Sequence, residues 1–396
     1  MRLLKDFSLS TISAGFVAAL VGFTSSVAIV FQAALAFAAT PAQLASWMWA
    51  LCIGMGLSTL IPSWWLRKPV MVAWSTPGAA VLAGAGVAGG FSMHDAVGAF
   101  MLCAALMALF GATGWFERVM NRIPMALASA LLAGVLARFG MQAFAAAQSA
   151  LVLLLLMLGS YLLARRAAPR YAVPICLAVA IAHAAASGQL ALTGVDLALA
   201  EPVFMAPRFS LAAAVSLALP LFVVTMASQN LPGVAAIRAA GYGGADGIPI
   251  SRVLTLTGLT SLVLAPFGAF ALNLSAITAA ICMGPQAHAD PARRYTGAMA
   301  NGLMYLLMGV FGAALSSLLL AFPIELVAAI AGIALLGAIG GALSSALQHE
   351  QQREAAVITF LVTLSGVVIA GVGSAFWGLL AGALALLVQE FRLKRD

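Results

Sequence analysis

The stretch KPVMVAWSTPGAAVLAGAGVAGG, Lys68–Gly90, has features that a plain membrane-spanning helix does not need. Val70–Trp74 is β-branched and aromatic, a composition that favours extended chain. Ser75 and Thr76 then offer a helix N-cap, and Pro77 suits the first helical position. We therefore predict a short extended piece followed by a half-helix.

A second stretch, APFGAFALNLSAITAAICMGP at Ala265–Pro285, has the same character. Pro266 and Gly268 indicate irregular or extended chain, and Asn273 or Ser275 could cap a short helix. Two half-helices that start near the middle of a membrane would point their N-termini at each other. Each N-terminus carries about +0.5 elementary charge and free N–H groups. The two stretches together predict an anion site that needs no arginine.

The composition predicts a polytopic all-α membrane protein. The chain has 396 residues, of which 63% are hydrophobic and 8% charged, whereas soluble domains carry about 25% charged residues. Four single cysteines give neither a disulfide framework nor a metal site. The sequence contains no HExxH motif and no evident Ser/His pairing, so we expect no enzyme, no cofactor and no metal.

Charge patterning predicts about fourteen membrane segments with both termini in the cytoplasm. With the N-terminus placed inside, 17 of the 19 Lys and Arg residues fall at inner ends of apolar runs. The exceptions are Arg138 and Arg208. Because the basic residues follow the membrane topology, the net charge of +7 does not indicate nucleic-acid binding.

The two halves resemble each other in sequence. DFSLS at Asp6 matches RFSLA at Arg208, and IPMALASALLAGVL from Ile123 matches FPIELVAAIAGIAL from Phe322. Seven crossings between the copies would place them in opposite orientations, as in inverted-repeat transporters. The alternative is a chance similarity between alanine-rich helices.

The stretch MASQNLPGV places Gln229 and Asn230 in the middle of an apolar segment. Pro232 removes a backbone donor and Gly233 loosens the turn, so this segment is predicted to free carbonyl groups near the two half-helix starts. The amides either bind a ligand or hold helices together. Ser25 lies at the equivalent position of the first segment and has the same two interpretations.

At these motifs the chain resembles the bacterial benzoate:proton symporters. STPGAAVLAG, MASQNLPGVAAIRAAGY, LSAITAAICMGP and AHADPARRY carry the similarity, which runs essentially end to end. The resemblance implies the fold of the uracil-transporter group, with fourteen segments in two inverted repeats of seven. It implies repeats at 1–190 and 209–396, joined by an outer link at 191–208. A core domain (segments 1–4 and 8–11) would move against a gate domain (segments 5–7 and 12–14).

The resemblance also implies binding positions between segments 3 and 10. Together with Ser25, the candidate substrate-binding residues are Ser75, Thr76, Ser228, Gln229, Asn230, Asn273 and Ser275. The uracil-type pattern has carboxylates on segments 8 and 10, whereas this chain has amides and hydroxyls there. A carboxylate would repel an anionic substrate, so its absence suits benzoate. Phe23, Phe31, Phe222, Phe267 and Phe270 are expected near the ring.

Proton coupling has four candidate residues: Glu325, His183, His288 and Asp290. Glu325 follows Pro323 closely, where a carboxylate could simply complement a helix N-terminus. His288 and Asp290 could instead form a loop network, and His183 could be a satisfied polar residue. In the family we expect GPEAH where this chain has GPQAH, so Gln286 weakens a proton role for that loop. A weak acid could also enter with its own proton.

The sequence therefore predicts import of benzoate, or a related aromatic carboxylate, with a proton across the inner membrane by alternating access. Its expected partners are this substrate, protons, the lipid bilayer and a second copy of the chain in a homodimer. A nucleobase or inorganic-anion transporter and an anion channel are the alternatives. Arg138 either draws anions into an outer vestibule or extends to the lipid headgroups. Gln32, nearer the outer end of the first segment, has both amide interpretations.

Overall fold

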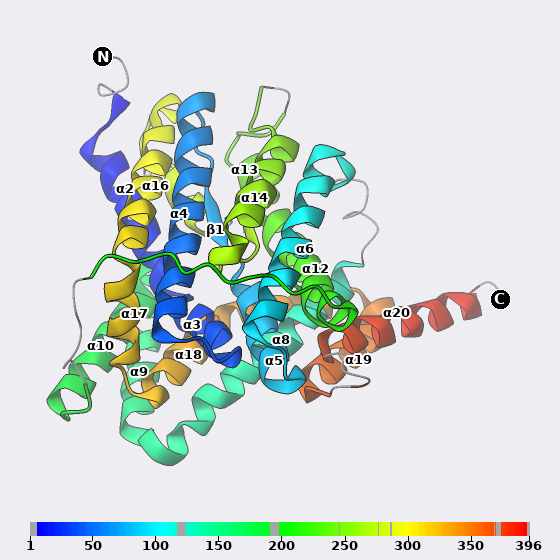
Figure 1. Cartoon of the computed structure of the whole chain (residues 1–396). Coiled ribbons are helices and arrows are strands. Elements are labelled where there is room, and N and C mark those ends of the chain that lie inside the picture. Colours follow the sequence, from blue (N-terminus) through cyan, green and yellow to red (C-terminus); the bar gives the residue numbers. More distant parts are fainter. Residues whose placement is uncertain are drawn as a thin grey trace.

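A computed structural model describes residues 6–116, 124–190, 198–244, 246–275, 277–285, 287–367, 369 and 374–393. The chain folds mostly into helices, and α2, α4, α6, α14 and α16 stand side by side in Figure 1. The helices of the first half are α2 (Leu9–Thr24), α3 (Val27–Ala36), α4 (Pro41–Leu66), α5 (Thr76–Gly89), α6 (Met93–Ala112), α8 (Met125–Ala145), α9 (Ala147–Ala167) and α10 (Ala172–Ala186). Those of the second half are α11 (Leu211–Ala213), α12 (Leu219–Thr225), α13 (Leu231–Ala239), α14 (Ile250–Leu264), α15 (Ile277–Met283), α16 (Tyr295–Val310), α17 (Gly312–Leu320), α18 (Ile324–Ala346), α19 (Arg353–Ser365) and α20 (Ser374–Leu393).

Many of these helices are long and apolar enough to cross a membrane. Within the described residues there are eight such helical stretches, or nine if the pair Pro291–Val310 and Gly312–Leu318, bent by 71°, is one span. Leu9–Ala36 is one of the eight, and it contains a break at Ser25 and Ser26 between α2 and α3. The predicted membrane protein is therefore confirmed, while the count of fourteen segments stays a prediction.

Two short strands lie inside this helical protein. β1 (Val72–Trp74) pairs antiparallel with β2 (Leu272–Leu274), and each strand is followed by a short helix, α5 or α15. The extended pieces predicted on either side of the chain's middle are thus present.

The helices form two groups that pack closely within themselves. In the first group, α16 lies against α2 and α4, where Gly15 faces the backbone of Gly297 and Gly56 faces that of Gly302. In the second, α8 packs against α18 and α19, with Gly332 of α18 set against the α8 backbone at Phe139. Small residues permit such close backbone approach between membrane helices.

An aromatic cluster supports the strands from the side of α4. Trp47, Phe100 and Phe270 are fully buried, and their ring centroids lie 5.3–5.9 Å apart. The indole of Trp47 also covers Gly268, whose φ is +105°. Only glycine adopts this conformation without strain and leaves room for the indole. The predicted chain irregularity at Gly268 therefore has a packing cause.

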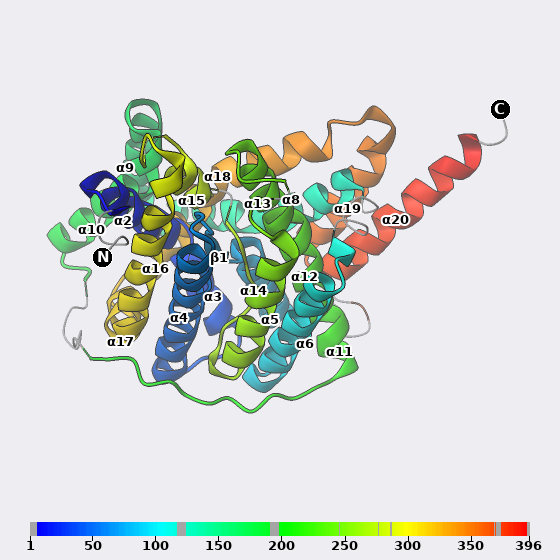
Figure 2. The same ribbon diagram turned by 90° about the horizontal axis from the view of Figure 1, so that it is seen from above.

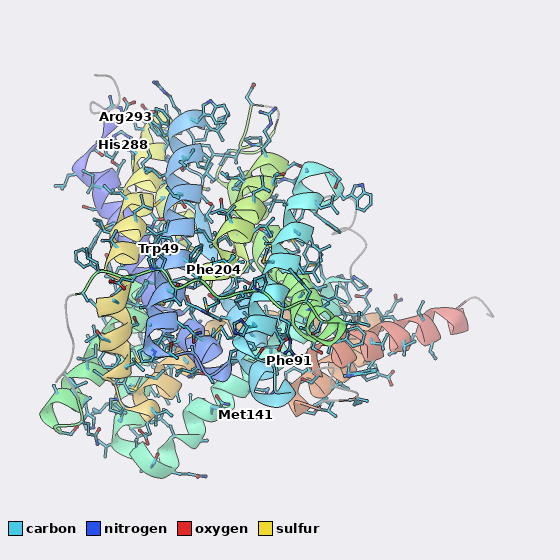
Figure 3. All side chains as sticks on the ribbon, in the orientation of Figure 1. Trp49, Phe91, Met141, Phe204, His288 and Arg293 are labelled. Atoms are coloured by element: carbon cyan, nitrogen blue, oxygen red, sulfur yellow. The ribbon has the colours of Figure 1, made fainter. Side chains whose placement is uncertain are left out.

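The described part of the link between the halves, residues 198–210, crosses the outside of the bundle in extended form (Figures 1 and 2). Phe204 of this link packs edge-on against Phe267, which in turn contacts Trp49 (Figure 3). Near the end of the link, the guanidinium Nε of Arg208 lies 2.8 Å from a carboxylate oxygen of Asp95 at the start of α6.

Replacing Asp95 by alanine should destabilise the protein more than replacing Arg208 by glutamine. Arg208 is 70% exposed, so loss of this ion pair costs at most about 1 kcal/mol. Asp95 is 3% exposed and also accepts hydrogen bonds from the Ser92 N–H and hydroxyl in a capping box; loss of a cap adds about 1 kcal/mol. Thermal unfolding of the purified variants measures the difference. Equal losses would show that the cap contributes nothing.

Candidate functional site

The antiparallel strand pair links the two halves of the chain symmetrically. The Ser75 N–H donates to the Ala271 carbonyl at 3.1 Å, and the Ser275 N–H donates to the Met71 carbonyl at 3.0 Å. Each donor and each acceptor lies 200 positions from its counterpart in the other half (75 to 275, 71 to 271). Because the strands run in opposite directions, α5 and α15 leave the pair in opposite directions.

Buried side chains satisfy the outer edges of the two strands. On β1, the Val72 N–H donates to Thr59 Oγ1 of α4 at 3.1 Å. On β2, the Leu272 N–H donates to Ser261 Oγ of α14 at 3.0 Å, and the Leu274 N–H donates to Asn230 Oδ1 at 2.9 Å. Each bond meets the requirement that backbone groups at membrane depth find partners within the protein. Asn230 is therefore a partner of the β2 backbone.

The start of α5 carries fewer free donors than its sequence suggested. Ser75 is the N-cap, its Oγ accepting from the Gly78 N–H at 3.1 Å and its carbonyl accepting from the Ala79 N–H at 2.8 Å. Pro77, at the second helical position, has no N–H. Among the described backbone donors of this turn, the Thr76 N–H is the one without a hydrogen-bond acceptor. α15 has seven residues, so α5 supplies the larger part of any helix-dipole effect.

A cavity of about 380 Å³ lies beside the strand pair, and we call it the Gln229 cavity. Its walls come from α2, α5, the turn before α13, α15 and α16 on one side, and from α8 and α18 on the other. Its polar lining consists of Ser25, Ser26, Thr76, Ser129, Ser228, Gln229, Ser275, Thr278, Tyr305 and Ser345. None of the described residues that line it is charged. Any anion in this space must be held by neutral donors.

The structure brings five of the eight predicted substrate-binding residues to this cavity: Ser25, Thr76, Ser228, Gln229 and Ser275. The other three, Ser75, Asn230 and Asn273, are fully buried behind it and are absent from its lining. Ser75 accepts a hydrogen bond from Thr225 Oγ1 at 2.7 Å, and Asn273 Nδ2 donates to the Ala271 carbonyl at 3.2 Å.

Gln229 differs from its neighbour Asn230 in one respect that matters for binding. The Gln229 amide is partly exposed to the cavity and has no hydrogen-bond partner within the described chain. Asn230 is fully buried and uses its Oδ1 on β2 and its Nδ2 on the Met226 sulfur, 3.2 Å away. One amide is thus available to a ligand, and the next is already engaged.

The segment that carries these amides remains helical through Pro232 and Gly233. It is helical from Leu211 to Ala239, with wider π turns at Ala214–Ala218 and Met226–Asn230. Each π turn ends two residues before a proline, because the wider turn accommodates a residue that cannot donate a hydrogen bond. Gly233 lies against Leu274 of β2, where a Cβ would come within 2.7 Å of the leucine Cβ. Because Gly233 has no side chain, β2 can pack close to this helix; the glycine does not loosen a turn here.

The aromatic residues of the cavity are not the expected ones. None of the five phenylalanines predicted near the ring lines the Gln229 cavity; Phe31 lines a different one, described below. Trp74 and Tyr305 line it instead. The Trp74 indole N–H donates to Ser26 Oγ at 2.8 Å, and its ring packs 5.6 Å from that of Phe23. A sequence signal for Trp74 existed, since it directly precedes the predicted cap of α5.

The four proton-coupling candidates do not line the Gln229 cavity. Glu325 lies in the first turn of α18 and His183 in the last turn of α10. His288 and Asp290 form a loop network before α16: the Asp290 N–H donates to His288 Nδ1, and Arg294 Nε donates to the His288 carbonyl. Figure 3 shows His288 near Arg293 at one end of the bundle. Gln286 lies outside the described residues.

The fold is that of a multi-pass membrane protein, and it contains a cavity large enough for a small ligand. The chain belongs to the benzoate membrane transport protein family, whose model matches residues 5–388. It is therefore a membrane transporter and not an enzyme. The family resemblance seen in the sequence motifs is confirmed.

Two similar proteins cover nearly the whole chain. The inner membrane protein YdcO of Escherichia coli (strain K12) is 47% identical over 98% of this chain and 97% of its own length. The benzoate membrane transport protein of Acinetobacter baylyi is 38% identical over 97% of this chain and 96% of its own length.

Solved structures of anion transporters share the fold. SLC26A9 matches with a TM-score of 0.62 at 11% identity, over 98% of this chain and 67% of that chain. The transmembrane domain of the cyanobacterial bicarbonate transporter BicA matches with a TM-score of 0.57 at 14% identity, over 95% of this chain and 97% of that one. At such low identity the likeness concerns the fold alone.

Proposed function

We propose that this transporter imports benzoate, or a related aromatic carboxylate, together with a proton across the inner membrane. The observation that carries the proposal is the Gln229 cavity. It combines the N-terminus of α5, neutral donors and two aromatic side chains in one uncharged space. A volume of about 380 Å³ falls in the range of small-molecule sites. The family and the benzoate transport protein from Acinetobacter baylyi support the choice of substrate.

In this proposal the carboxylate lies at the start of α5 and the ring lies against Trp74. The carboxylate accepts hydrogen bonds from the Thr76 N–H and from the Gln229 amide, and Ser25, Ser228 and Ser275 supply hydroxyls around it. Hydrogen bonds to a charged group each stabilise by about 1.5–3 kcal/mol. Ser75, Asn230 and Asn273 hold the strands and the cap in place, so they act on binding through position rather than contact.

Transport follows an alternating-access cycle in our proposal. The fourteen crossings comprise the long apolar helices, the bent pair α16 and α17, the two strand-plus-helix segments, and the shorter helices α10, α19 and α20. The core domain contains α2–α6 and α11–α17, and the gate domain contains α8–α10 and α18–α20. The cavity between α5 on one side and α8 and α18 on the other supports this division. Cytoplasmic termini and a homodimer belong to the same proposal.

We propose that the substrate binds as the carboxylate anion, then takes up the proton, and crosses as the neutral acid. The described residues that line the Gln229 cavity include no carboxylate or histidine, so the group best placed to carry a proton is the substrate's own carboxylate. Glu325, His183, His288 and Asp290 would then be replaceable without loss of coupling. Glu325→Gln tests this most directly, because Glu325 lies within the first turn of a membrane helix.

Uptake into proteoliposomes tests the function. Radiolabelled benzoate should accumulate uphill under an inward proton gradient, and an uncoupler should abolish the accumulation. Protein-free liposomes are the required control because benzoic acid itself crosses lipid. Accumulation that survives the uncoupler would disprove proton coupling. Stronger inhibition by uracil or sulfate than by unlabelled benzoate would assign a nucleobase or inorganic anion instead, and flux at channel rates without a gradient would indicate an anion channel.

A further inference from the structure

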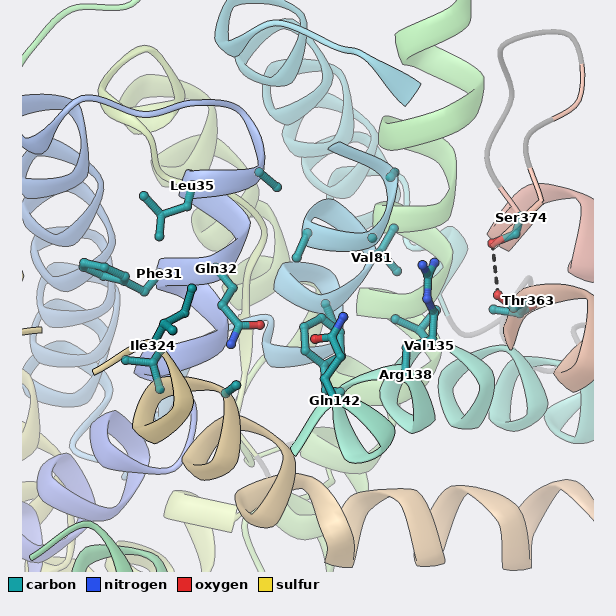
Figure 4. A pocket seen from close by; sticks show the side chains of 18 of the residues that line it. Phe31, Gln32, Leu35, Val81, Val135, Arg138, Gln142, Ile324, Thr363 and Ser374 are labelled. Atoms are coloured by element: carbon teal, nitrogen blue, oxygen red, sulfur yellow. Dashed lines mark hydrogen bonds between the residues drawn. The ribbon is translucent and has the colours of Figure 1, made fainter. Parts of the chain in front are cut away.

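A second and larger cavity lies at the other end of the same helices. It has a volume of about 640 Å³ and is enclosed by α3, α5, α8 and the start of α18 (Figure 4). We call it the Arg138 cavity. It shares no lining residue with the Gln229 cavity: α8 contributes residues 135–142 here and residues 125–136 there, and α18 contributes residues 324–328 here and residues 334–345 there. The two cavities therefore open toward opposite ends of α8 and α18.

Arg138 brings a positive charge into this space, and no acidic side chain among the described residues pairs with it. It is half-buried and faces the cavity in Figure 4. It forms neither an ion pair nor a hydrogen bond with any described residue. Its guanidinium packs over Gly366 at the C-terminal end of α19. The C-terminal end of α19 carries about half a negative charge. This partial charge attracts the guanidinium but neutralises only part of its positive charge.

Neutral donors surround the guanidinium. Gln142 lies one turn after Arg138 on the same face of α8, and Gln32 reaches into the space from α3; Figure 4 shows both amides directed into the cavity. Thr363 also lines the cavity, but its hydroxyl is buried against Gly378 of α20, so we assign it no contact with the ligand.

The rest of the lining is apolar and aromatic. Phe31, Phe139 and Phe322 contribute rings that are at least nine-tenths buried. An inorganic anion would gain nothing from these walls, whereas the ring of an aromatic carboxylate would bury its faces against them. The polar groups and the apolar walls together match an aromatic carboxylate.

We propose that the Arg138 cavity is a second binding site for the aromatic carboxylate, which receives it at the face opposite the opening of the Gln229 cavity. The carboxylate pairs with the Arg138 guanidinium and the two glutamine amides, and the ring lies among the three phenylalanines. The identity of the ligand rests on the proposed function. A positive site at one mouth also raises the local concentration of anions there.

Equilibrium binding of radiolabelled benzoate to the purified full-length protein tests the proposal. The native protein should bind two molecules per chain, and Arg138→Gln should remove one of them with a loss of affinity of about 10–100-fold. Arg138→Lys should retain part of that affinity because the charge is kept. Arg252→Gln, which removes an exposed arginine from α14 far from the cavity, is the charge-matched control and should bind like the native protein.

Two unaltered sites in Arg138→Gln would overturn the proposal. If that variant fails to fold, the double variant Gln32→Ala with Gln142→Ala gives the same test without removing the charge. A purely structural arginine would lower thermal stability and leave binding stoichiometry unchanged. A failure of the proposed function can be distinguished from a failure of this site. If the native protein shows no benzoate uptake but still binds one benzoate in a way that depends on Arg138, transport is disproved and the Arg138 site is retained.

Discussion

Gln229→Ala should reduce benzoate uptake at least about 10-fold while leaving the amount and thermal stability of the protein unchanged. The Gln229 amide lines the cavity and has no hydrogen-bond partner within the described chain, so its removal costs the fold no hydrogen bond. The substitution does remove one hydrogen bond to a bound carboxylate, which corresponds to about 1.5–3 kcal/mol or about 10–100-fold in affinity. Initial uptake rates over a range of benzoate concentrations measure the change.

The adjacent residue provides the matched control. Asn230→Ala leaves the Leu274 N–H buried without an acceptor, so it should lower thermal stability by about 1–3 kcal/mol. The two variants remove the same kind of side chain from neighbouring positions, yet one should impair transport and the other folding. Normal uptake kinetics in Gln229→Ala would move the substrate site elsewhere. Equal loss of stability in both variants would mean that neither amide is available to a ligand.

Gly233→Val should prevent the protein from reaching its native state. Gly233 touches Leu274, and a Cβ placed there would lie 2.7 Å from the leucine Cβ and 2.9 Å from its carbonyl oxygen. Because part of this obstacle is backbone, the strand itself must shift. Overpacking costs about 1–3 kcal/mol in ordinary cores and more where the neighbour cannot move. The yield of monodisperse protein after detergent extraction measures the effect.

Gly159→Val is the control for this substitution. Gly159 lies within α9, and a Cβ there would have no neighbour within 4 Å. Its yield should equal that of the native protein. A normal yield of Gly233→Val, with unchanged uptake, would show that β2 can move away from α13 without consequence.

Local sequence patterns predicted the scaffold of the site well. The β-branched run before Ser75 and the proline after it lie within three residues of each other, and they determine strand, cap and helix start by short-range effects. Pro266 and Gly268 marked the break before β2 in the same local way, although the packing of Trp47 on Gly268 was not visible in the sequence. The half-helix pair was predictable because each feature depends on neighbours in the sequence.

Local sequence patterns did not predict which polar residues line the cavity and which hydrogen-bond to the strands. Whether an amide binds a ligand or a strand depends on which atoms approach from another part of the chain, as Leu274 does for Asn230. The ring-binding wall shows the same limit. Phenylalanines are common throughout membrane helices, whereas Trp74 lines the cavity because β1 and Ser26 orient its indole. The larger cavity around Arg138 likewise depends on four helices that meet only in the fold.

The strand pair also constrains how the protein is made. Ala73 pairs with Asn273, which a ribosome adds 200 residues later, after about 10–40 s at typical synthesis rates of about 5–20 residues per second. During that interval the inner edge of β1 has no partner, and lipid cannot supply one. The nascent first half must therefore keep this stretch in contact with water or the insertion machinery. A chain truncated before residue 272 would leave that edge permanently open, and we expect quality-control proteases to degrade it.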